Sequence, residues 1–265
     1  MTKNRIDMVL AQCKAAKRKA LIPFITAGDG GYACTEQAVL NMAENGADLI
    51  ELGVPFSDPI AEGPVIQRAS ERSLQGGTTL KGIFEMVQRL KKKTDTPLLL
   101  MMYLNTIFCY GTDRFFKTCQ DCGIDGVIVP DIPYEEKDEI QGSADKYHIH
   151  NISLVTPASE DRIQMIASAA TGFLYCVSSN GVTGVRQEFH TQFDTFFEKI
   201  YKYAKVPCAV GFGISGPEAA KTMSKYCDGV IVGSAIVRLV EQYGSAAAPK
   251  EIGSFVKSLR EALDN

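Results

Sequence analysis

The chain of 265 residues contains no tryptophan, only three histidines and no long apolar run. A helix that crosses a membrane needs about 20 consecutive apolar residues, so the sequence predicts no membrane partner. The first residues also lack the apolar core of a signal peptide, which indicates a cytoplasmic protein. The formal net charge of −3 excludes a strongly basic chain, so nucleic acid is not an expected partner either.

Cysteine and histidine occur without the spacing of a metal site. The eight cysteines are scattered along the chain, and in a cytoplasmic protein they are expected to be reduced thiols. Cys119 and Cys122 are closely spaced, but no second pair completes a four-ligand site, so their spacing favours packing on one face of a helix. The sequence therefore predicts no bound metal ion.

Short apolar segments alternate with helical patterns along the whole chain. The expected strands are 20–26, 48–54, 97–103, 126–130, 150–155, 173–177, 207–210 and 229–232. The expected helices are 35–45, 79–93, 112–122, 135–146, 160–169, 193–204, one from 217, one from 236 and 250–263, with a further helix before the first strand. None of the strands alternates apolar with polar residues, so each is expected to be covered on both faces, as in a parallel sheet.

Eight strand–helix units in about 250 residues have the size and count of a closed (β/α)8 barrel, the TIM barrel. We therefore predict an α/β chain that forms a single (β/α)8 barrel domain over residues 1–265, with an extra N-terminal helix. An open doubly wound sheet is the rival architecture, but no GxGxxG motif follows the first expected strand.

Residues 48–67 (DLIELGVPFSDPIAEGPVIQ) carry the most unusual pattern in the chain. Glu51 interrupts an apolar strand, and a long, proline-rich loop follows with Asp58 and Glu62. A carboxylate buried without a partner is costly, and apolar surroundings raise its pKa toward neutrality, which suits proton transfer. The pattern therefore favours an active-site role for Glu51, against the alternative of a buried ion pair.

Glycines gather in the turns after the last three expected strands. They occupy 181–184, positions 211 and 213, and Gly233, which Ser234 follows at the start of a helix. Glycine lets the backbone approach an anion closely, and the first amides of a helix bind phosphate. Turns need glycine in any case, but its recurrence in three successive loops predicts a phosphate site made by backbone amides.

Mostly apolar residues stand near the ends of other strands, where a barrel places its site. They are Phe24, Met101, Ile128, Val155, Tyr175 and Phe212. Each one alone is more typical of the core. Together they predict a flat apolar pocket with a phosphate anchor at one end and carboxylates at the other.

The chain resembles the tryptophan synthase alpha chain family over its whole length. The motifs that carry the resemblance are 51–59 (ELGVPFSDP) with 63–64 (GP), 23–29 (PFITAGD), 102–105 (MYLN), 130–133 (PDIP), 181–184 (GVTG), 211–214 (GFGI) and 233–237 (GSAIV). The resemblance implies a barrel that cleaves indole-3-glycerol phosphate to indole and glyceraldehyde 3-phosphate. It also implies a pyridoxal-phosphate-dependent beta chain as partner in an α2β2 complex, and no cofactor in this chain.

The same resemblance implies roles for individual residues. Glu51 protonates C3 of the indole and takes up the hydroxyl proton, Glu62 stabilises the charge on the indole N–H, and Tyr175 supports them. The expected substrate-binding residues are Phe24, Ile66, Met101, Ile128, Pro130, Val155, Thr183 and Phe212. The expected phosphate-binding residues are Gly184, Gly213, Gly233 and Ser234, and the expected partner-facing residues are Pro55, Asp58, Pro59, Tyr103, Asn105 and Asp131.

Two positions depart from the family pattern. Glu62 stands where the family has aspartate, and Ser179-Asn180 stands where an arginine is frequent. These departures motivate one alternative to the active subunit, a chain that activates the beta partner without efficient cleavage. A lyase that acts alone is a second alternative, because the chemistry needs no partner. A phosphate-binding barrel isomerase of another pathway is a further alternative.

Overall fold

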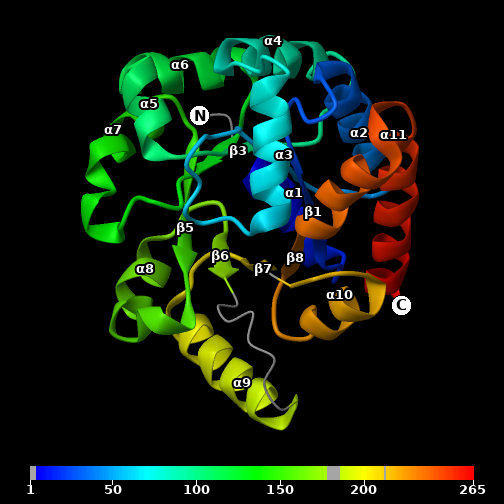
Figure 1. Ribbon diagram of the computed structural model, residues 1–265. Coiled ribbons are helices and arrows are strands. Elements are labelled where there is room, and N and C mark those ends of the chain that lie inside the picture. The colour runs from blue at the N-terminus through cyan, green and yellow to red at the C-terminus, as the bar shows by residue number, and fades with distance from the viewer. Residues whose placement is uncertain (1–3, 178–185, 212) are drawn as a thin grey trace.

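The computed structural model describes residues 4–177, 186–211 and 213–265, and in this part of the chain eight parallel strands close into a barrel (Figure 1). The strands are β1 (Ala20–Thr26), β2 (Ile50–Gly53), β3 (Leu98–Met101), β4 (Gly126–Ile128), β5 (His150–Val155), β6 (Leu174–Val177), β7 (Cys208–Gly211) and β8 (Gly229–Val232). Each strand pairs with its neighbours in the sequence, and β8 pairs with β1 to close the ring. The predicted (β/α)8 barrel is confirmed.

Helices surround the strands. They are α1 (Arg5–Ala15), α2 (Tyr32–Glu44), α3 (Pro64–Gln75), α4 (Leu80–Leu90), α5 (Leu104–Tyr110), α6 (Thr112–Cys122), α7 (Asp138–Lys146), α8 (Ile163–Ala169), α9 (Arg186–Tyr203), α10 (Pro217–Met223) and α11 (Ser234–Asp264), with the 3-10 turns η1 (Tyr134–Glu136) and η2 (Pro157–Arg162). α11 comprises two helices joined at Gly244, where the backbone leaves helical geometry with φ 68°.

Alternate residues of each strand point to opposite faces, and this alternation divides the apolar side chains into two layers. Leu21 and Ile25 of β1 pack against the surrounding helices. Ile22 points inward and meets Leu49 and Leu99 inside the barrel. Both faces of the strands are therefore buried, as their unbroken apolar sequence predicts.

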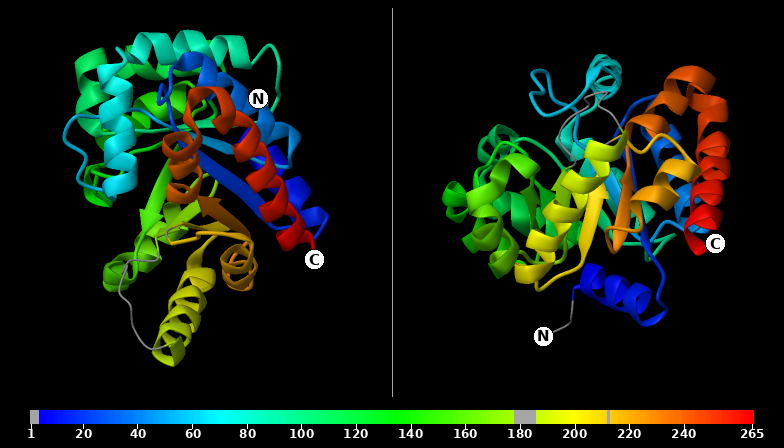
Figure 2. Two further views of the ribbon diagram at one scale, coloured as in Figure 1. Left: turned by 45° about the vertical axis from the view of Figure 1, so that its right-hand side comes forward. Right: turned by 90° about the horizontal axis from the view of Figure 1, so that it is seen from below.

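The predicted N-terminal helix, α1, closes one end of the barrel (Figure 2, right). Its Ile6, Leu10 and Cys13 join the barrel-interior cluster. The Asn4 side chain accepts a hydrogen bond from the Ile6 N–H as the helix cap. α3 lies at the other end of the molecule in the same view, so α1 leaves the carboxyl ends of the strands free for a site.

Three helical features differ from the sequence-based expectation. α3 occupies the second half of the segment expected to be a long loop, α5 was not predicted, and α9 begins at Arg186 rather than near residue 193. α3 buries mainly the small or polar residues Ala69, Ser70 and Ser73, so it lacks the apolar stripe from which a helix is recognised in a sequence.

Candidate active site

Glu51 lies on β2 with its side chain inside the barrel. Its backbone is in register with Phe24 on β1 and Leu99 on β3, and the residue is 0% exposed. Neither carboxyl oxygen has a hydrogen-bond partner among the described residues. Burial alone raises the pKa of Glu51 from its ordinary value of 4.5 to about 8. The group is therefore predominantly protonated at neutral pH and can donate a proton.

This raised pKa makes the stability of the fold depend on pH. Glu51 keeps its proton in the folded chain up to about pH 8 but loses it near pH 4.5 when unfolded, so folding takes up a proton between these values. Burial of Glu51 therefore destabilises the fold. This destabilisation is smallest below pH 4.5 and grows as pH rises, reaching about 3 kcal/mol at pH 7. Between about pH 5 and pH 7, the unfolding free energy measured with urea should fall less for Glu51→Gln than for the parent, with a difference of about 2 kcal/mol. Equal slopes would contradict a buried, protonated Glu51.

Tyr175 points inward from β6 and stays partly exposed. Gly211 on the neighbouring β7 makes room for it, because a Cβ at Gly211 would lie 2.4 Å from the Tyr175 hydroxyl oxygen. Burial, and secondly the charge of Glu51, raise the pKa of Tyr175 well above its ordinary value. The hydroxyl therefore remains a neutral hydrogen-bond donor at all ordinary pH values.

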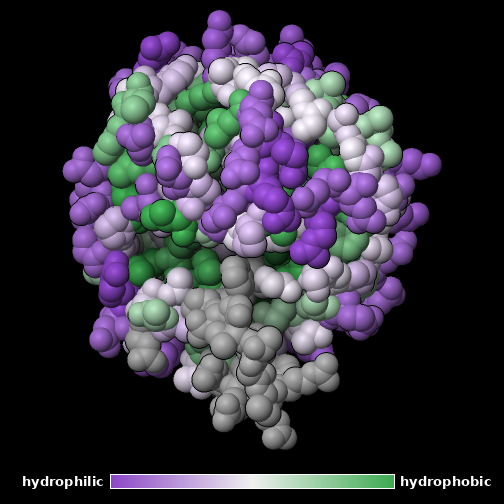
Figure 3. Space-filling view, in the orientation of Figure 1, coloured by the Kyte–Doolittle hydropathy of each residue, from purple (hydrophilic) through white to green (hydrophobic). Residues whose placement is uncertain are grey.

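An apolar surface covers the mouth of the barrel near β1. Phe24 contacts a small cluster with Ala69 and Val237, against which Ile66 and Met101 pack. Gly53 is required under this ring, since a Cβ there would lie 2.4 Å from Cζ of Phe24. Figure 3 shows apolar residues on this face to the left of the polar surface of α3. Three of the predicted substrate-binding residues are thus brought together by β1, α3 and β3.

Other predicted substrate-binding residues have different positions. Ile128 is 0% exposed in the barrel-interior cluster, and Pro130 is partly exposed after β4. Val155 packs in the outer layer against the helices, and Leu154 takes the inward position on β5. The strand alternation thus places Val155, the last residue of β5, in the layer that packs against the helices, and its role in substrate binding stays a prediction.

Glu62 is held in place by a neighbouring tyrosine. The Tyr103 hydroxyl donates a hydrogen bond to the Glu62 carboxylate and accepts one from the Ala61 N–H at 2.8 Å. The Gln67 side-chain amide donates to the Glu62 carbonyl oxygen at 2.9 Å. Burial raises the pKa of Glu62 above its ordinary value, and the hydrogen bond from Tyr103 opposes this rise. The two carboxyl groups therefore sit in different environments, apolar for Glu51 and hydrogen-bonded for Glu62.

Two residues predicted to face a partner are buried inside the chain. Tyr103 is 3% exposed and stacks on Phe56 at 4.8 Å between ring centroids, and Pro55 is buried as well. The loop after β2 folds back onto the start of α5 and buries both side chains, and their contact with a partner stays a prediction. The Asp131 carboxylate, half-buried, accepts hydrogen bonds from the Leu104 N–H at 3.0 and 3.2 Å and so caps α5.

The outer surface formed by the loop after β2 and by α5 carries both polar and apolar exposed residues. Asp58 and Asn105 are exposed, and Pro59 is partly exposed. Ile60 is 82% and Phe108 46% exposed, although both are large and apolar. Sequence reasoning missed these two. A lone isoleucine among proline and acidic residues was the available indication for Ile60.

The described part of the predicted phosphate site lies at the start of α11. Gly233 precedes the helix without any side-chain cap, and Ser234 is its exposed first residue. The first amides of a helix have no partner within it, so these remain available to an anion. Gly213 is exposed with φ 73°, a value that favours glycine. Thr183, Gly184, Phe212 and the Ser179-Asn180 departure lie outside the described residues.

The described residues contain no cluster of histidine, cysteine, aspartate or glutamate that could hold a metal ion. Within the same part of the chain, no helix is both long and apolar enough to cross a membrane. A closed parallel barrel with two differently tuned carboxyl groups and an open helix start at its carboxyl end is the architecture of a TIM-barrel enzyme.

Comparison with known proteins defines the family. The family model described as tryptophan synthase alpha chain matches residues 10–263. Curated relatives of that name include those from Thermoanaerobacter sp. (strain X514), 46% identical with 98% of this chain and 100% of the relative covered, and Geobacter sulfurreducens, 45% identical with 99% and 100% covered. The chain belongs to the tryptophan synthase alpha chain family. Members of this family catalyse the lyase reaction that cleaves indole-3-glycerol phosphate, a step of tryptophan biosynthesis.

Solved structures agree with this assignment. Tryptophan synthase subunit alpha from Legionella pneumophila str. Paris is 38% identical, with a TM-score of 0.91 and 100% of each chain covered. A structure from Pyrococcus furiosus, described as the basis of mutual activation of the tryptophan synthase α2β2 complex, is 34% identical, with a TM-score of 0.84 and 91% of this chain and 98% of that chain covered. In this family, pyridoxal phosphate lies in the beta subunit.

Proposed function

We propose that this chain cleaves indole-3-glycerol phosphate to indole and glyceraldehyde 3-phosphate, with Glu51 as the acid and base. The observation that carries the proposal is a buried carboxyl group inside the barrel, which has no hydrogen-bond partner among the described residues and a pKa raised by burial to about 8. The C–C bond to the indole can break only after C3 of the ring accepts a proton. A carboxyl group that is protonated at neutral pH supplies that proton without any prior step.

The reaction leaves Glu51 as it started. Glu51 gives its proton to C3, which produces a positively charged ring nitrogen and a carboxylate. The carboxylate then takes the proton of the hydroxyl on the adjacent glycerol carbon. The electrons of that O–H bond form the aldehyde, the C–C bond breaks, and its electron pair neutralises the ring nitrogen. One proton enters and one leaves, so Glu51 is again protonated when indole departs.

Glu62 and Tyr175 support this exchange. An ionised Glu62 would accept a hydrogen bond from the indole N–H and stabilise the positive charge as it develops. The hydrogen bond from Tyr103 favours this ionised form and orients the carboxylate. Tyr175, a neutral donor, would hydrogen-bond to an oxygen of the substrate. The two carboxyl groups have different roles because their environments differ. An apolar site keeps Glu51 neutral, and a hydrogen-bonded site keeps Glu62 charged.

The remaining contacts follow the shape of the mouth. Phe24, Ile66 and Met101 would hold the flat indole ring, because they form an apolar surface close to Glu51. The open amides at the start of α11, with Gly213, Gly233 and Ser234, would bind the phosphate. Thr183, Gly184 and Phe212 keep the substrate and phosphate roles that the family resemblance implies. None of these steps uses a cofactor, so the chain is proposed to need none.

The partner is proposed to be a beta chain that holds pyridoxal phosphate, in an α2β2 complex. The exposed apolar side chains of Ile60 and Phe108, with Asp58, Pro59 and Asn105 nearby in sequence, favour a protein surface in this region. Tyr103 links the loop that carries Ile60 to the start of α5, which carries Phe108. Contact at this surface would therefore act on Glu62 through one hydrogen bond.

Indole release from indole-3-glycerol phosphate tests the proposal. We expect turnover by the purified chain and faster turnover when a beta chain is added, because the added chain would order the loop and α5. Release at the rate of Glu51→Gln would contradict the lyase and favour a chain that only activates its partner. A rate unchanged by the beta chain would favour a lyase that acts alone. If the chain released no indole at all, a phosphate-binding barrel isomerase of another pathway would be favoured.

A further inference from the structure

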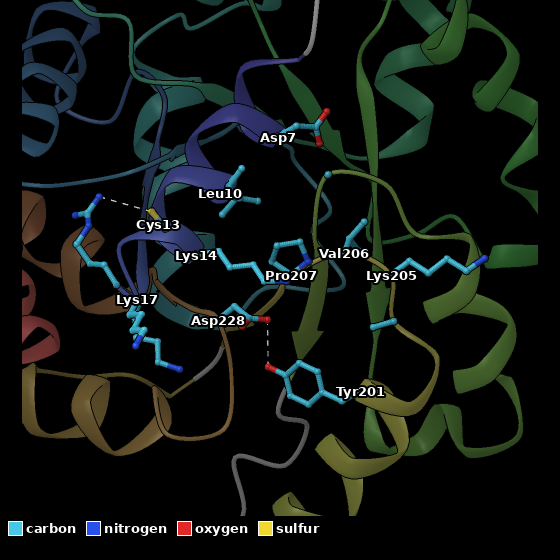
Figure 4. Close-up of a pocket in the computed structure, with 15 residues that line it drawn as sticks. Asp7, Leu10, Cys13, Lys14, Lys17, Tyr201, Lys205, Val206, Pro207 and Asp228 are labelled. Atoms are coloured by element: carbon cyan, nitrogen blue, oxygen red, sulfur yellow. Dashed lines mark hydrogen bonds between the residues drawn. The ribbon is translucent and has the colours of Figure 1, made fainter.

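A second hollow lies at the amino ends of the strands, on the side of the barrel closed by α1 (Figure 4). It has a volume of about 600 Å³ and is bordered by the residues that precede four strands. These are Lys19 before β1, Gly172 before β6, Pro207 before β7 and Asp228 before β8. The hollow is therefore separated from the mouth of the barrel by the length of the strands.

The border of this hollow is strongly basic, although the whole chain has a net charge of −3. It contains the cations Lys14, Lys17, Arg18, Lys19 and Lys205 against the acids Asp7 and Asp228. Both acids are engaged: the Asp228 carboxylate accepts hydrogen bonds from the Cys208 N–H at 2.9 Å and the Tyr201 hydroxyl at 3.2 Å, and Asp7 lies 3.1 Å from His150 Nε2. The two carboxylates offset two of the five cations, which leaves an excess of positive charge on this border.

Lys14 and Lys17 supply the available charges. Arg18 is paired with Asp48, and the Lys19 ammonium donates to the Cys227 carbonyl oxygen at 2.7 Å. The ammonium groups of Lys14 and Lys17, by contrast, bind no other group in the part of the chain that the structure describes. Figure 4 shows Lys14 reaching toward Pro207 across the hollow, whereas Lys205 extends outward from the opposite border.

Lys17 occupies a backbone position that favours glycine. It ends α1 with φ 53°, in the left-handed region, and the following Arg18 N–H closes the helix by donating to the Cys13 carbonyl oxygen at 2.9 Å. Glycine is the usual residue at this point of a helix end because it has no Cβ to strain the backbone. A lysine at this point places a positive charge at the carboxyl end of α1, where it suits the helix dipole, and also at the border of the hollow.

The floor of the hollow is apolar. Leu10, Val206 and Pro207 line it, and the ring of Tyr201 stands beside them, 45% exposed, with its hydroxyl held by Asp228. Figure 4 shows this ring turned toward Asp228 at the lower side of the hollow. A flat ring can lie on such a floor, while ammonium groups above it bind negative charge.

We propose that this hollow binds an organic phosphate that also carries an aromatic ring, of the class of nucleoside diphosphates. The two free ammonium groups match a phosphate chain, and the tyrosine and proline surface matches a planar ring. A volume of about 600 Å³ accommodates a molecule of this size. The ligand binds at the opposite end of the barrel from the proposed catalytic groups, so it is an effector or a carried ligand and not the substrate.

Calorimetric titration of the full chain with ADP at low salt tests this. We expect saturable binding that weakens as salt is added, and much weaker binding of adenosine, which lacks the charge, and of pyrophosphate, which lacks the ring. Lys17→Gly together with Lys14→Gln should weaken ADP binding about tenfold or more. Lys81→Gln, which removes an equally exposed lysine on α4, should leave it unchanged.

The Lys17→Gly substitution allows a loss of ADP binding to be distinguished from a loss of folding. Glycine relieves the left-handed backbone, so the melting temperature of this variant should equal or exceed that of the parent. A second readout uses the absence of tryptophan, since Tyr201→Trp places a sole indole fluorophore at the hollow, and ADP should change its emission. No saturable binding, equal binding by the lysine variants, or displacement of ADP by glycerol 3-phosphate would each overturn the proposal.

Discussion

Replacing Glu51 by glutamine is expected to lower the rate of indole release by about a thousandfold, since a positioned acid–base group contributes about 10²–10⁴ to the rate. Glutamine has nearly the shape of the protonated acid, so the fold and the apolar mouth should be kept. It cannot give up a proton to C3 or take the hydroxyl proton. The loss should therefore appear in kcat, with little change in KM.

Two measurements identify the cause of this loss. Binding of glyceraldehyde 3-phosphate to Glu51→Gln should match the parent, because the phosphate contacts lie on other strands. Glu71→Gln is the matched control, since Glu71 is an exposed acid of α3 and its replacement should leave turnover unchanged. A Glu51→Gln variant with near-parental turnover would show that another group moves the protons.

Replacing Glu62 by glutamine is expected to cost about a hundredfold in kcat, the effect of removing one group that stabilises developing charge. The amide keeps the hydrogen-bonding size of the side chain but not the negative charge that faces the indole N–H. The kcat of Glu62→Asp should stay within about tenfold of the parent value, because the negative charge remains and only the side chain is shorter. The largest loss expected from a displacement of about 1 Å is about a hundredfold.

Replacing Tyr103 by phenylalanine tests the ionisation of Glu62 alone, because the length of the Glu62 side chain stays the same. The hydrogen bond from Tyr103 opposes the rise in the pKa of Glu62, so its loss should raise that pKa further. The acidic limb of the pH–rate profile should then move to higher pH, while the alkaline limb, set by Glu51 with its pKa of about 8, should stay in place. An unchanged profile would mean that Tyr103 supports the loop but does not act on the charge of Glu62. If Glu62→Gln were fully active, the proposed role of this carboxylate would be wrong.

Much of the catalytic half of the site could be predicted from local pattern. Glu51 could be recognised because one acid in a continuous apolar strand is costly to bury unless it stays neutral. The structure shows it buried, with no hydrogen-bond partner in the part of the chain that is described. Strand alternation could also have been applied to β5. It would have selected Leu154 rather than Val155 as the inward residue.

Other features depend on segments that are distant in sequence. α5 starts at a position capped by Asp131, which comes 27 residues later, and no pattern within α5 reveals that cap. Tyr103 and Glu62 are 41 residues apart, and their hydrogen bond, which orients the Glu62 carboxylate, forms only when the chain folds. The basic hollow likewise collects side chains from residues 7–19 and from residues 172–228.

The amino-acid sequence by itself determined the barrel, the inward carboxyl group and the family, because apolar periodicity, buried charge and motif are local properties. Only the tertiary structure decided the partners of Glu62, the burial of Pro55 and Tyr103, and the free charges beneath the barrel. Those depend on which side chains meet when the ring closes, and closure is set by the packing of the whole chain.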